Sequence, residues 1–146
     1  MKRSSRMQSI VKIANKEEEA AARALAEAID NLDKQGKALQ ELIVFKKDYA
    51  ERFHKTSNTN AMSIQQFHNF IAQLNQGIEH QQKIIVQAEE HIEEQRQLWI
   101  ERHNRTRALN KVVENYAKQE LDSAEKLEQK LLDEQAMRVS AKGRKP

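Results

Sequence analysis

Apolar residues recur in alternating steps of three and four along the first third of the chain. The alternation runs from residue 25 to residue 53 and has one charged member: Leu25, Ile29, Leu32, Gly36, Leu39, Ile43, Lys46, Ala50 and Phe53. Nearer the N-terminus the pattern is weaker, and four residues join it only after a slip in register: Ile10, Ala14, Glu17 and Ala21. This spacing is a heptad seam, and it predicts a long helix that packs against another helix.

The same spacing returns after residue 66 and continues for fifteen positions. Its members are Phe67, Ile71, Leu74, Ile78, Gln81, Ile85, Ala88, Ile92, Gln95, Trp99, Arg102, Thr106, Leu109, Val113 and Tyr116. After residue 116 the seam shifts, to Leu121, Ala124, Leu127 and Leu131. The second seam predicts a second long helix, so the expected fold class is all-α.

A helix stop and a helix start lie between the two seams. The stretch "TSNTN" at 56–60 consists of short polar side chains that bond the local backbone and compete with helix formation. Ser63 is the expected N-cap, Gln66 completes a capping box, and Met62 and Phe67 occupy the positions of a hydrophobic staple. These signals indicate a turn that folds the second helix back on the first.

The expected architecture is a single antiparallel coiled-coil hairpin over residues 1–146, with the second helix longer than the first. Its parts are helix one at about 4–55, a tip at about 56–62, helix two at about 63–139 and a basic tail at 140–146. Pairing in this register places Leu32 opposite Ile85, and matches a first helix that starts near Ser4 as far as about Val113. The alternative is that each helix pairs with other copies in an extended homodimer.

Composition narrows the function classes. Charged residues make up 32% of the chain, with three Gly and one Pro, so little apolar volume is left for a catalytic domain with a deep pocket. Cysteine is absent, and the longest apolar run, "LIVF" at 42–45, is far shorter than a membrane span. The basic N-terminal stretch lacks the apolar core of a secretion signal. These features favour a cytoplasmic protein.

Residues that would carry a reaction are not arranged for one. The chain has no glycine-rich phosphate loop, and its five histidines include no pair at three- or four-residue spacing. The "SAEK" at 123–126 matches a serine–lysine pattern, but on an exposed helix without a pocket it is an ordinary surface segment. The sequence therefore predicts no catalytic residue, no metal site and no cofactor.

Apolar residues outside the two seams form a second stripe on each helix. The stripes comprise Leu42, Phe45 and Tyr49 on the first helix and Phe70, Leu74, Gly77 and Gln81 on the second, of which Leu74 and Gln81 also belong to the seam. Because a two-helix hairpin has no third layer to cover them, an exposed binding patch near the tip is expected. The alternative is that the aromatic rings wrap the tip and seal it.

Basic residues gather at both ends of the chain without acidic neighbours. They are Lys2, Arg3, Arg6, Lys12 and Lys16 at the start and Arg138, Lys142, Arg144 and Lys145 at the end. A third basic run, residues 102–111, faces the acidic residues 17–19 in the expected register, which predicts neutralisation within the hairpin. The formal net charge is only +3, and one aromatic residue is interleaved with this run, so nucleic-acid binding is not expected.

Four segments resemble the FliJ family of the flagellar type III export apparatus. They are "KEEEAAARALAE" at 16–27, "LIVFKKDY" at 42–49, "FHNFIAQLNQGIEHQ" at 67–81 and "RQLWIERHNR" at 96–105. The resemblance covers nearly the whole chain. It implies an antiparallel hairpin similar to the central stalk of rotary ATP synthases, with no enzymatic activity of its own.

The resemblance also implies partners: the hexameric flagellar export ATPase at the terminal half, the cytoplasmic domain of the membrane export gate nearer the tip, and export chaperones. Membrane association would then be peripheral, through these partners. The implied gate-binding residues coincide with the stripes, namely Leu42, Phe45, Tyr49, Phe70, Leu74, Gly77 and Gln81, while Ala38 stands where a polar member is expected. For the ATPase the resemblance implies only the regions 1–20 and 115–140, within and beside which Arg3, Arg6, Arg138 and Lys142 are the expected contacts.

Three other classes fit parts of the pattern. A generic structural coiled coil would lack the patch near the tip, and a stalk of an injectisome would share this architecture. A basic nucleic-acid-binding module would bind in a strongly salt-dependent way.

Overall fold

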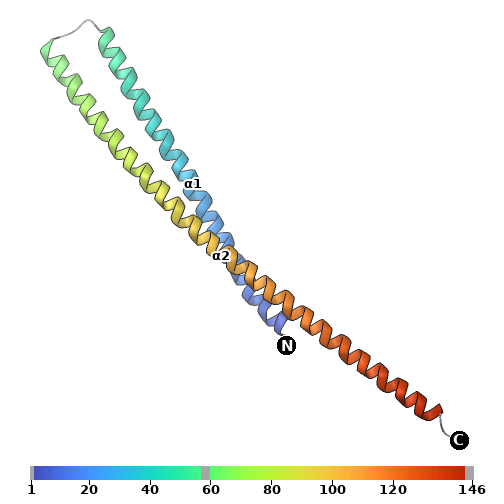
Figure 1. The fold of residues 1–146 in the computed structure, drawn as a ribbon. Helices are drawn as coiled ribbons and strands as arrows, with labels where there is room; N and C mark the ends of the chain where they lie inside the picture. Colours follow the sequence, from blue (N-terminus) through green and yellow to red (C-terminus); the bar gives the residue numbers. More distant parts are fainter. Residues whose placement is uncertain (1, 57–59, 144–146) are drawn as a thin grey trace. The chain divides into compact units, whose positions relative to one another are not determined.

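The computed structural model describes residues 2–56 and 60–143, and these form two long helices. Helix α1 spans Arg3–Lys55 and helix α2 spans Ala61–Gly143. The helices run antiparallel and pack against each other, as Figure 1 shows, and no strand is present in the described residues. The predicted all-α hairpin with a longer second helix is confirmed. Residues 57–59 of the predicted tip and residues 144–146 of the predicted basic tail lie outside the described residues.

Neither helix, over the residues described, holds a stretch that is both long and apolar enough to cross a membrane.

Helix α2 begins one turn earlier than its expected cap. The Ser63 amide donates to Asn60 Oδ1 at 2.7 Å, so Asn60, and not Ser63, is the N-cap. Met62 lies inside the helix and is 73% exposed, so the predicted staple is wrong as well. Asn caps a helix as well as Ser does, and its earlier position adds a turn to the helix. At the end of α1, Thr56 donates through its amide and its hydroxyl to the Arg52 carbonyl, at 3.1 and 2.7 Å.

The chain packs as two units, each built from both helices. The central unit comprises residues 20–100, and the terminal unit comprises residues 1–19 and 101–146.

The seam of α2 follows the prediction. All fifteen positions from Phe67 to Tyr116 are at least partly buried, and Phe67, Ala88, Ile92 and Thr106 are fully so. A regular 3.5-residue repeat therefore describes this helix through both units.

The seam of α1 differs from the prediction at Ile29 and Ile43, whereas the predicted Gly36 and Ala50 are half-buried. The buried or half-buried residues alternate in steps of three and four without interruption: Ser4, Met7, Val11, Ala14, Glu18, Ala21, Leu25, Ala28, Leu32, Gln35, Leu39, Leu42, Lys46, Tyr49 and Phe53. Ile29 and Ile43, which the sequence pattern placed in the seam, are 49% and 40% exposed. The expected slip in register is absent.

Alanines explain why the pattern misleads. Ala14, Ala21 and Ala28 are each seven residues apart and each at most 6% exposed. In the central unit, the pairing of Gln35 with Gln81 places Ala28 near Ala88 and Ile92, both buried. A small side chain on one helix lets a larger one on the facing helix fill the space, so the buried position need not be the more hydrophobic of two neighbours.

The register of the central unit agrees with the prediction to within one residue. Gln81 Nε2 donates to the Gln35 carbonyl at 3.0 Å and to Gln35 Oε1 at 2.8 Å, which forms a polar layer in the apolar seam. In the terminal unit, α1 pairs with a longer part of α2 than expected. Ser4 bonds Glu120, whereas the predicted register placed it near Val113. The Glu120 side chain reaches the amide at the end of α1, which has no partner within its own helix.

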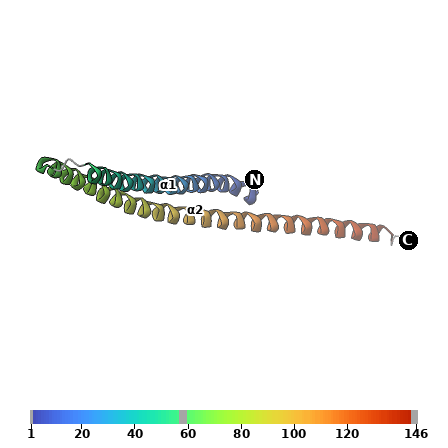
Figure 2. The same ribbon diagram turned by 90° about the horizontal axis from the view of Figure 1, so that it is seen from above.

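Helix α2 continues beyond the start of α1. Every residue from 121 to 143 is exposed, and Figure 2 shows this part of α2 without α1 beside it. We call residues 121–143 the C-terminal extension. It includes the predicted shifted positions Leu121, Ala124, Leu127 and Leu131, which have no covering helix.

Candidate interaction surfaces

Five aromatic rings form a continuous cluster in the central unit. We call Phe45, Tyr49, Phe53, Phe67 and Phe70 the aromatic cluster. Phe53 and Phe67 stack across the two helices with ring centroids 4.0 Å apart, and Tyr49 contacts Phe70 at 4.5 Å and Phe67 at 5.7 Å. Phe45 lies at its edge, 6.2 Å from Phe70 in an edge-to-face arrangement. Such contacts stabilise the pairing of the helices beyond the area that they bury.

The aromatic cluster divides into a sealed part and an exposed part. Phe67 is 9% exposed, and Tyr49, Phe53 and Phe70 are half-buried, so these rings close the space between the helices. Phe45 alone is exposed, with half of its surface accessible. The sequence left open whether these rings are exposed or seal the hairpin. Most of them close the space between the helices, and Phe45 is exposed.

The predicted gate-binding stripe is less exposed than its spacing indicated. Leu42 and Tyr49 were placed outside the seam, which is wrong, because they occupy two of the alternating buried positions of α1. Leu74 is half-buried as well, and Gln81 is engaged inside the seam with Gln35. The error follows from the misplaced seam of α1, since moving Ile43 outward moves Leu42 inward.

Gly77 lies at an open edge of this stripe. It is half-buried, yet a Cβ atom built on it would meet no atom within 4 Å. The glycine is therefore not required by a close helix contact within the chain, and it leaves a shallow gap beside Leu74.

Charged side chains link the helices in the terminal unit. We call Glu17, Glu18, Arg102, His103 and Arg105 the charged cluster. Glu17 Oε2 accepts from Arg102 Nη1 at 2.8 Å and from Arg105 Nη1 at 3.1 Å, and Glu18 Oε1 lies 2.6 Å from His103 Nδ1. The prediction that the basic run at 102–111 faces the acids at 17–19 is confirmed for these residues.

The surroundings favour the charged form of Glu18. The hydrogen bond from His103 lowers the pKa of the Glu18 carboxyl below its ordinary value of 4.5, against a smaller opposing effect of burial. Beside it, the buried Thr106 hydroxyl donates to the Arg102 carbonyl at 3.0 Å and to the Ala14 carbonyl of the facing helix at 3.4 Å. The one buried polar residue of the described chain is therefore satisfied.

Glu120 holds the first turn of α1. It accepts from the Ser4 amide at 3.1 Å and from the Ser4 hydroxyl at 2.6 Å, and these bonds lower the pKa of its carboxyl. Arg3 lies over the ring of Tyr116, 5.8 Å from its centroid. Arg3 thus has an aromatic partner inside the chain. The Glu120 contact could not be predicted from the sequence, because no local pattern marks a cap that is supplied from 116 residues away.

The other predicted ATPase-contacting residues lie on helical surfaces. Arg6 is exposed in the first turns of α1, and Arg138 and Lys142 are exposed in the C-terminal extension. The structure does not gather these residues into one site.

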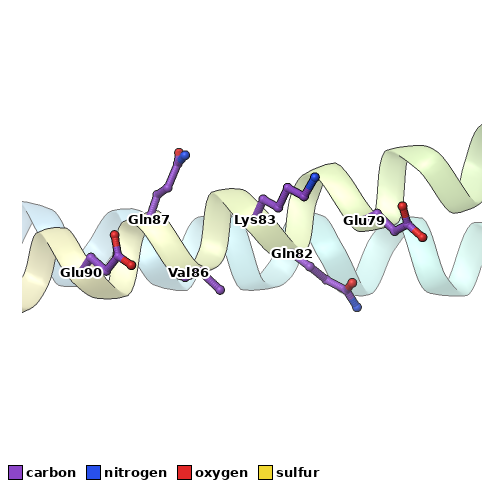
Figure 3. A pocket seen from close by; sticks show the side chains of 6 residues that line it. All are labelled: Glu79, Gln82, Lys83, Val86, Gln87 and Glu90. Carbon is purple, nitrogen blue, oxygen red and sulfur yellow. The ribbon is translucent and has the colours of Figure 1, made fainter.

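A shallow surface hollow lies along α2 in the central unit. Its lining is Glu79, Gln82, Lys83, Val86, Gln87 and Glu90. All six come from one helix and all are exposed, and in Figure 3 their side chains spread along the helix without enclosing a space. Such a surface cannot exclude water around a ligand in the way that a binding pocket does.

Comparison with known proteins places the chain. No curated protein and no solved structure gives a significant match. The family model described as "Flagellar FliJ protein" matches residues 2–145. This match covers nearly the whole chain and agrees with the two antiparallel helices, so the chain belongs to the FliJ family, whose members are coiled-coil components of flagellar export.

Proposed function

We propose that this protein is a non-enzymatic stalk of the flagellar type III export apparatus, which links the export ATPase ring to the membrane export gate. In this role it promotes ATP hydrolysis and substrate export, handles export chaperones, and stays cytoplasmic at the inner face of the membrane through its partners. Family membership and the two unlike ends of the hairpin support the proposal: one packing unit presents an exposed aromatic ring, and the other presents a bare helix with charged groups.

The observation that carries the gate contact is the exposure of Phe45. Its ring is half accessible while it rests against Tyr49 and Phe70, which hold it in place. An aromatic side chain that is already ordered loses little further conformational entropy when a partner covers it. We assign the centre of the gate contact to Phe45 and its edge to Phe70, Leu74 and Gly77. Leu42, Tyr49 and Gln81 support this surface from the seam.

The gate contact is tested with Phe45→Ala and, as a matched control, Val44→Ala, which truncates a neighbouring exposed apolar residue outside the aromatic cluster. Truncating a central interface aromatic often costs about 2 kcal/mol of binding, which is roughly thirtyfold in affinity. We expect Phe45→Ala to lose that affinity for the gate's cytoplasmic domain and to impair swimming, with a near-normal melting temperature. If both variants bind the gate as tightly as the parent chain, the contact lies elsewhere.

The ATPase contact is assigned to Arg6, Arg138 and Lys142, with Arg3 positioned by Tyr116. Reversing charges on a helical surface changes stability by no more than about 0.5 kcal/mol, so Arg138→Glu with Lys142→Glu leaves the fold intact. We expect this variant to stimulate ATP hydrolysis less than the parent chain while gate binding is kept. Reversal of Lys83 on the hollow surface of α2 serves as the control. Equal stimulation by all three chains would contradict the assignment.

A further inference from the structure

The terminal unit presents two surfaces that complement each other, one on each helix. The first is the outer face of α1 over residues 2–16, a segment that has five basic residues and no acidic one. One of the five, Arg3, lies over Tyr116 of α2 and does not belong to this face. Ile10 and Ile13 are exposed on it, Ile13 by 57%, although the paired side of the same turns buries Ala14 and half-buries Met7 and Val11. This face is therefore basic with an apolar centre.

The second surface is the C-terminal extension of α2. Its large apolar residues are all exposed: Leu121, Leu127, Leu131, Leu132, Met137 and Val139. Positive and negative residues are separated along the extension. Residues 122–134 hold five acids and two lysines, whereas the only charged residues among 135–143 are Arg138 and Lys142. The first half of the extension is thus acidic and rich in leucine, and it fits a basic surface with exposed isoleucines.

The two surfaces cannot meet within one chain. Helix α2 is continuous to Gly143, and no glycine or proline interrupts residues 121–142, so the extension runs on past the start of its own α1. Folding it back onto the outer face of α1 would require breaking the helix, which its sequence does not favour. The complementarity can be satisfied only between two molecules.

We propose that two copies of the isolated chain form an antiparallel dimer in which the extension of each copy packs on the basic outer face of the other copy's α1. Thr106 lies beside Ala14. This contact fixes which residues of α1 and α2 lie level within one copy. When the two α2 helices cross about a two-fold axis near Gln119, Leu131 of one copy is therefore level with Ile13 of the other. Glu134 is level with Lys16 in the same way. The contact is made twice, as a two-fold axis requires. Parallel pairing of two extensions would instead set acid against acid.

Charge reversal tests the pairing. Lys12, Lys16, Glu128 and Glu134 are exposed, so changing them spares the packing between α1 and α2. By sedimentation equilibrium at about 0.1 M salt, where exposed charges still interact over about 10 Å, we expect K12E/K16E and E128K/E134K each to weaken dimerisation at least about tenfold. The chain with all four changes should return to within about threefold of the parent, because both surfaces have exchanged sign. E79K/K83E, on the hollow surface of α2, should leave the dimer unchanged.

Cysteine crosslinking gives an independent test, because the chain has no cysteine of its own. Mixing an Ile13→Cys chain with a Leu131→Cys chain should give a disulfide between the two under mild oxidation, in excess over either homodisulfide. A parent chain that stays monomeric at about 100 μM would overturn the proposal. A dimer that neither double charge reversal weakens would also overturn it. So would a chain with all four changes that does not regain the dimer affinity of the parent. The proposal concerns the isolated chain and does not depend on the proposed function.

Discussion

The two packing units hold the same pair of helices together by different chemistry. In the central unit, stacked rings close the seam, with Phe53 on Phe67 at 4.0 Å. In the terminal unit, the seam mixes apolar residues with Arg102 and Thr106, and ion pairs link the helices beside it, as between Glu17 and Arg102 at 2.8 Å. Apolar contacts are insensitive to moderate salt, whereas half-exposed ion pairs are screened by it. The two ends of one coiled coil should therefore respond to different conditions.

The largest expected effect is that of Phe67→Ala in the central unit. Phe67 is nearly buried and stacks on Tyr49 and Phe53, so removing its ring takes away the stacking partner of Phe53 and one of the two stacking partners of Tyr49. Phe→Ala changes in buried sites cost about 3 to 5 kcal/mol. We expect a loss of about 3 kcal/mol in the free energy of unfolding in urea, equal at 0.1 and 0.5 M NaCl. Phe45→Ala is the control and should cost less than about 1 kcal/mol.

A smaller effect is expected from Glu17→Gln with Glu18→Gln in the terminal unit. The pairs they make with Arg102, Arg105 and His103 are partly exposed, so screening limits their combined worth to about 1 kcal/mol. The loss should show as faster amide exchange at residues 4–18, while residues 45–70 keep their protection. Glu19→Gln, an exposed neighbour, should change nothing. If 0.5 M NaCl slows exchange at residues 4–18 in the parent chain, the ionic account of this unit is wrong.

Gly77→Ala should stabilise the central unit. A Cβ there has no neighbour within 4 Å, and alanine favours a helix interior over glycine by about 1 kcal/mol. We expect a gain of up to that size in unfolding free energy, and a similar gain for Gly36→Ala, whose added Cβ is equally unobstructed. A loss of stability at either site would mean that the gap serves the packing of the helices. Weaker gate binding by the Gly77 variant alone would support the proposed edge of the gate contact.

The smallest expected effect is the loss of stability at low pH. The pKa values of Glu18 and Glu120 are lowered in the folded chain, so their contribution to stability is complete above pH 4.5 and is lost as the pH falls through the lowered values. Protection of the first turns of α1 should therefore decline below pH 4.5 before that of the aromatic cluster. Glu120→Gln should remove part of this decline. Equal decline in both units would contradict the difference between them.

The fold could be predicted from the sequence because the heptad spacing can be recognised without knowing which individual residues are buried. Large apolar residues mark the seam of α2 at most positions, and every position predicted from Phe67 to Tyr116 is at least partly buried. On α1 the spacing was right, but Ile29 and Ile43 were wrongly placed in the seam. Ala28 beside Ile29 and Leu42 beside Ile43 offer two apolar choices each, and hydrophobicity alone favours the residue that proves exposed.

The candidate surfaces were harder to predict, because the exposure of their side chains depends on which of two neighbouring residues lies in the seam of α1. Misplacing Ile43 made Leu42 and Tyr49 look uncovered, and only Phe45 of the first-helix stripe is exposed. Contacts such as Gln35 with Gln81 need the register to within a turn, and Glu120 with Ser4 needs the end of α1 as well. Charge was the better guide, since the facing runs around Glu17 and Arg102 were expected from sequence and are present.

The bond between Ser4 and Glu120 also bears on how the chain folds during synthesis. The side chain that caps the start of α1 is made 116 residues after Ser4. Translation at about 5 to 20 residues per second leaves α1 without its full partner for several seconds. The contacts nearest in sequence, Phe53 with Phe67, can form first, and pairing then proceeds toward the N-terminus as α2 emerges. The start of α1 is therefore the last part of the pair to be completed, and the part most dependent on cellular protection until then.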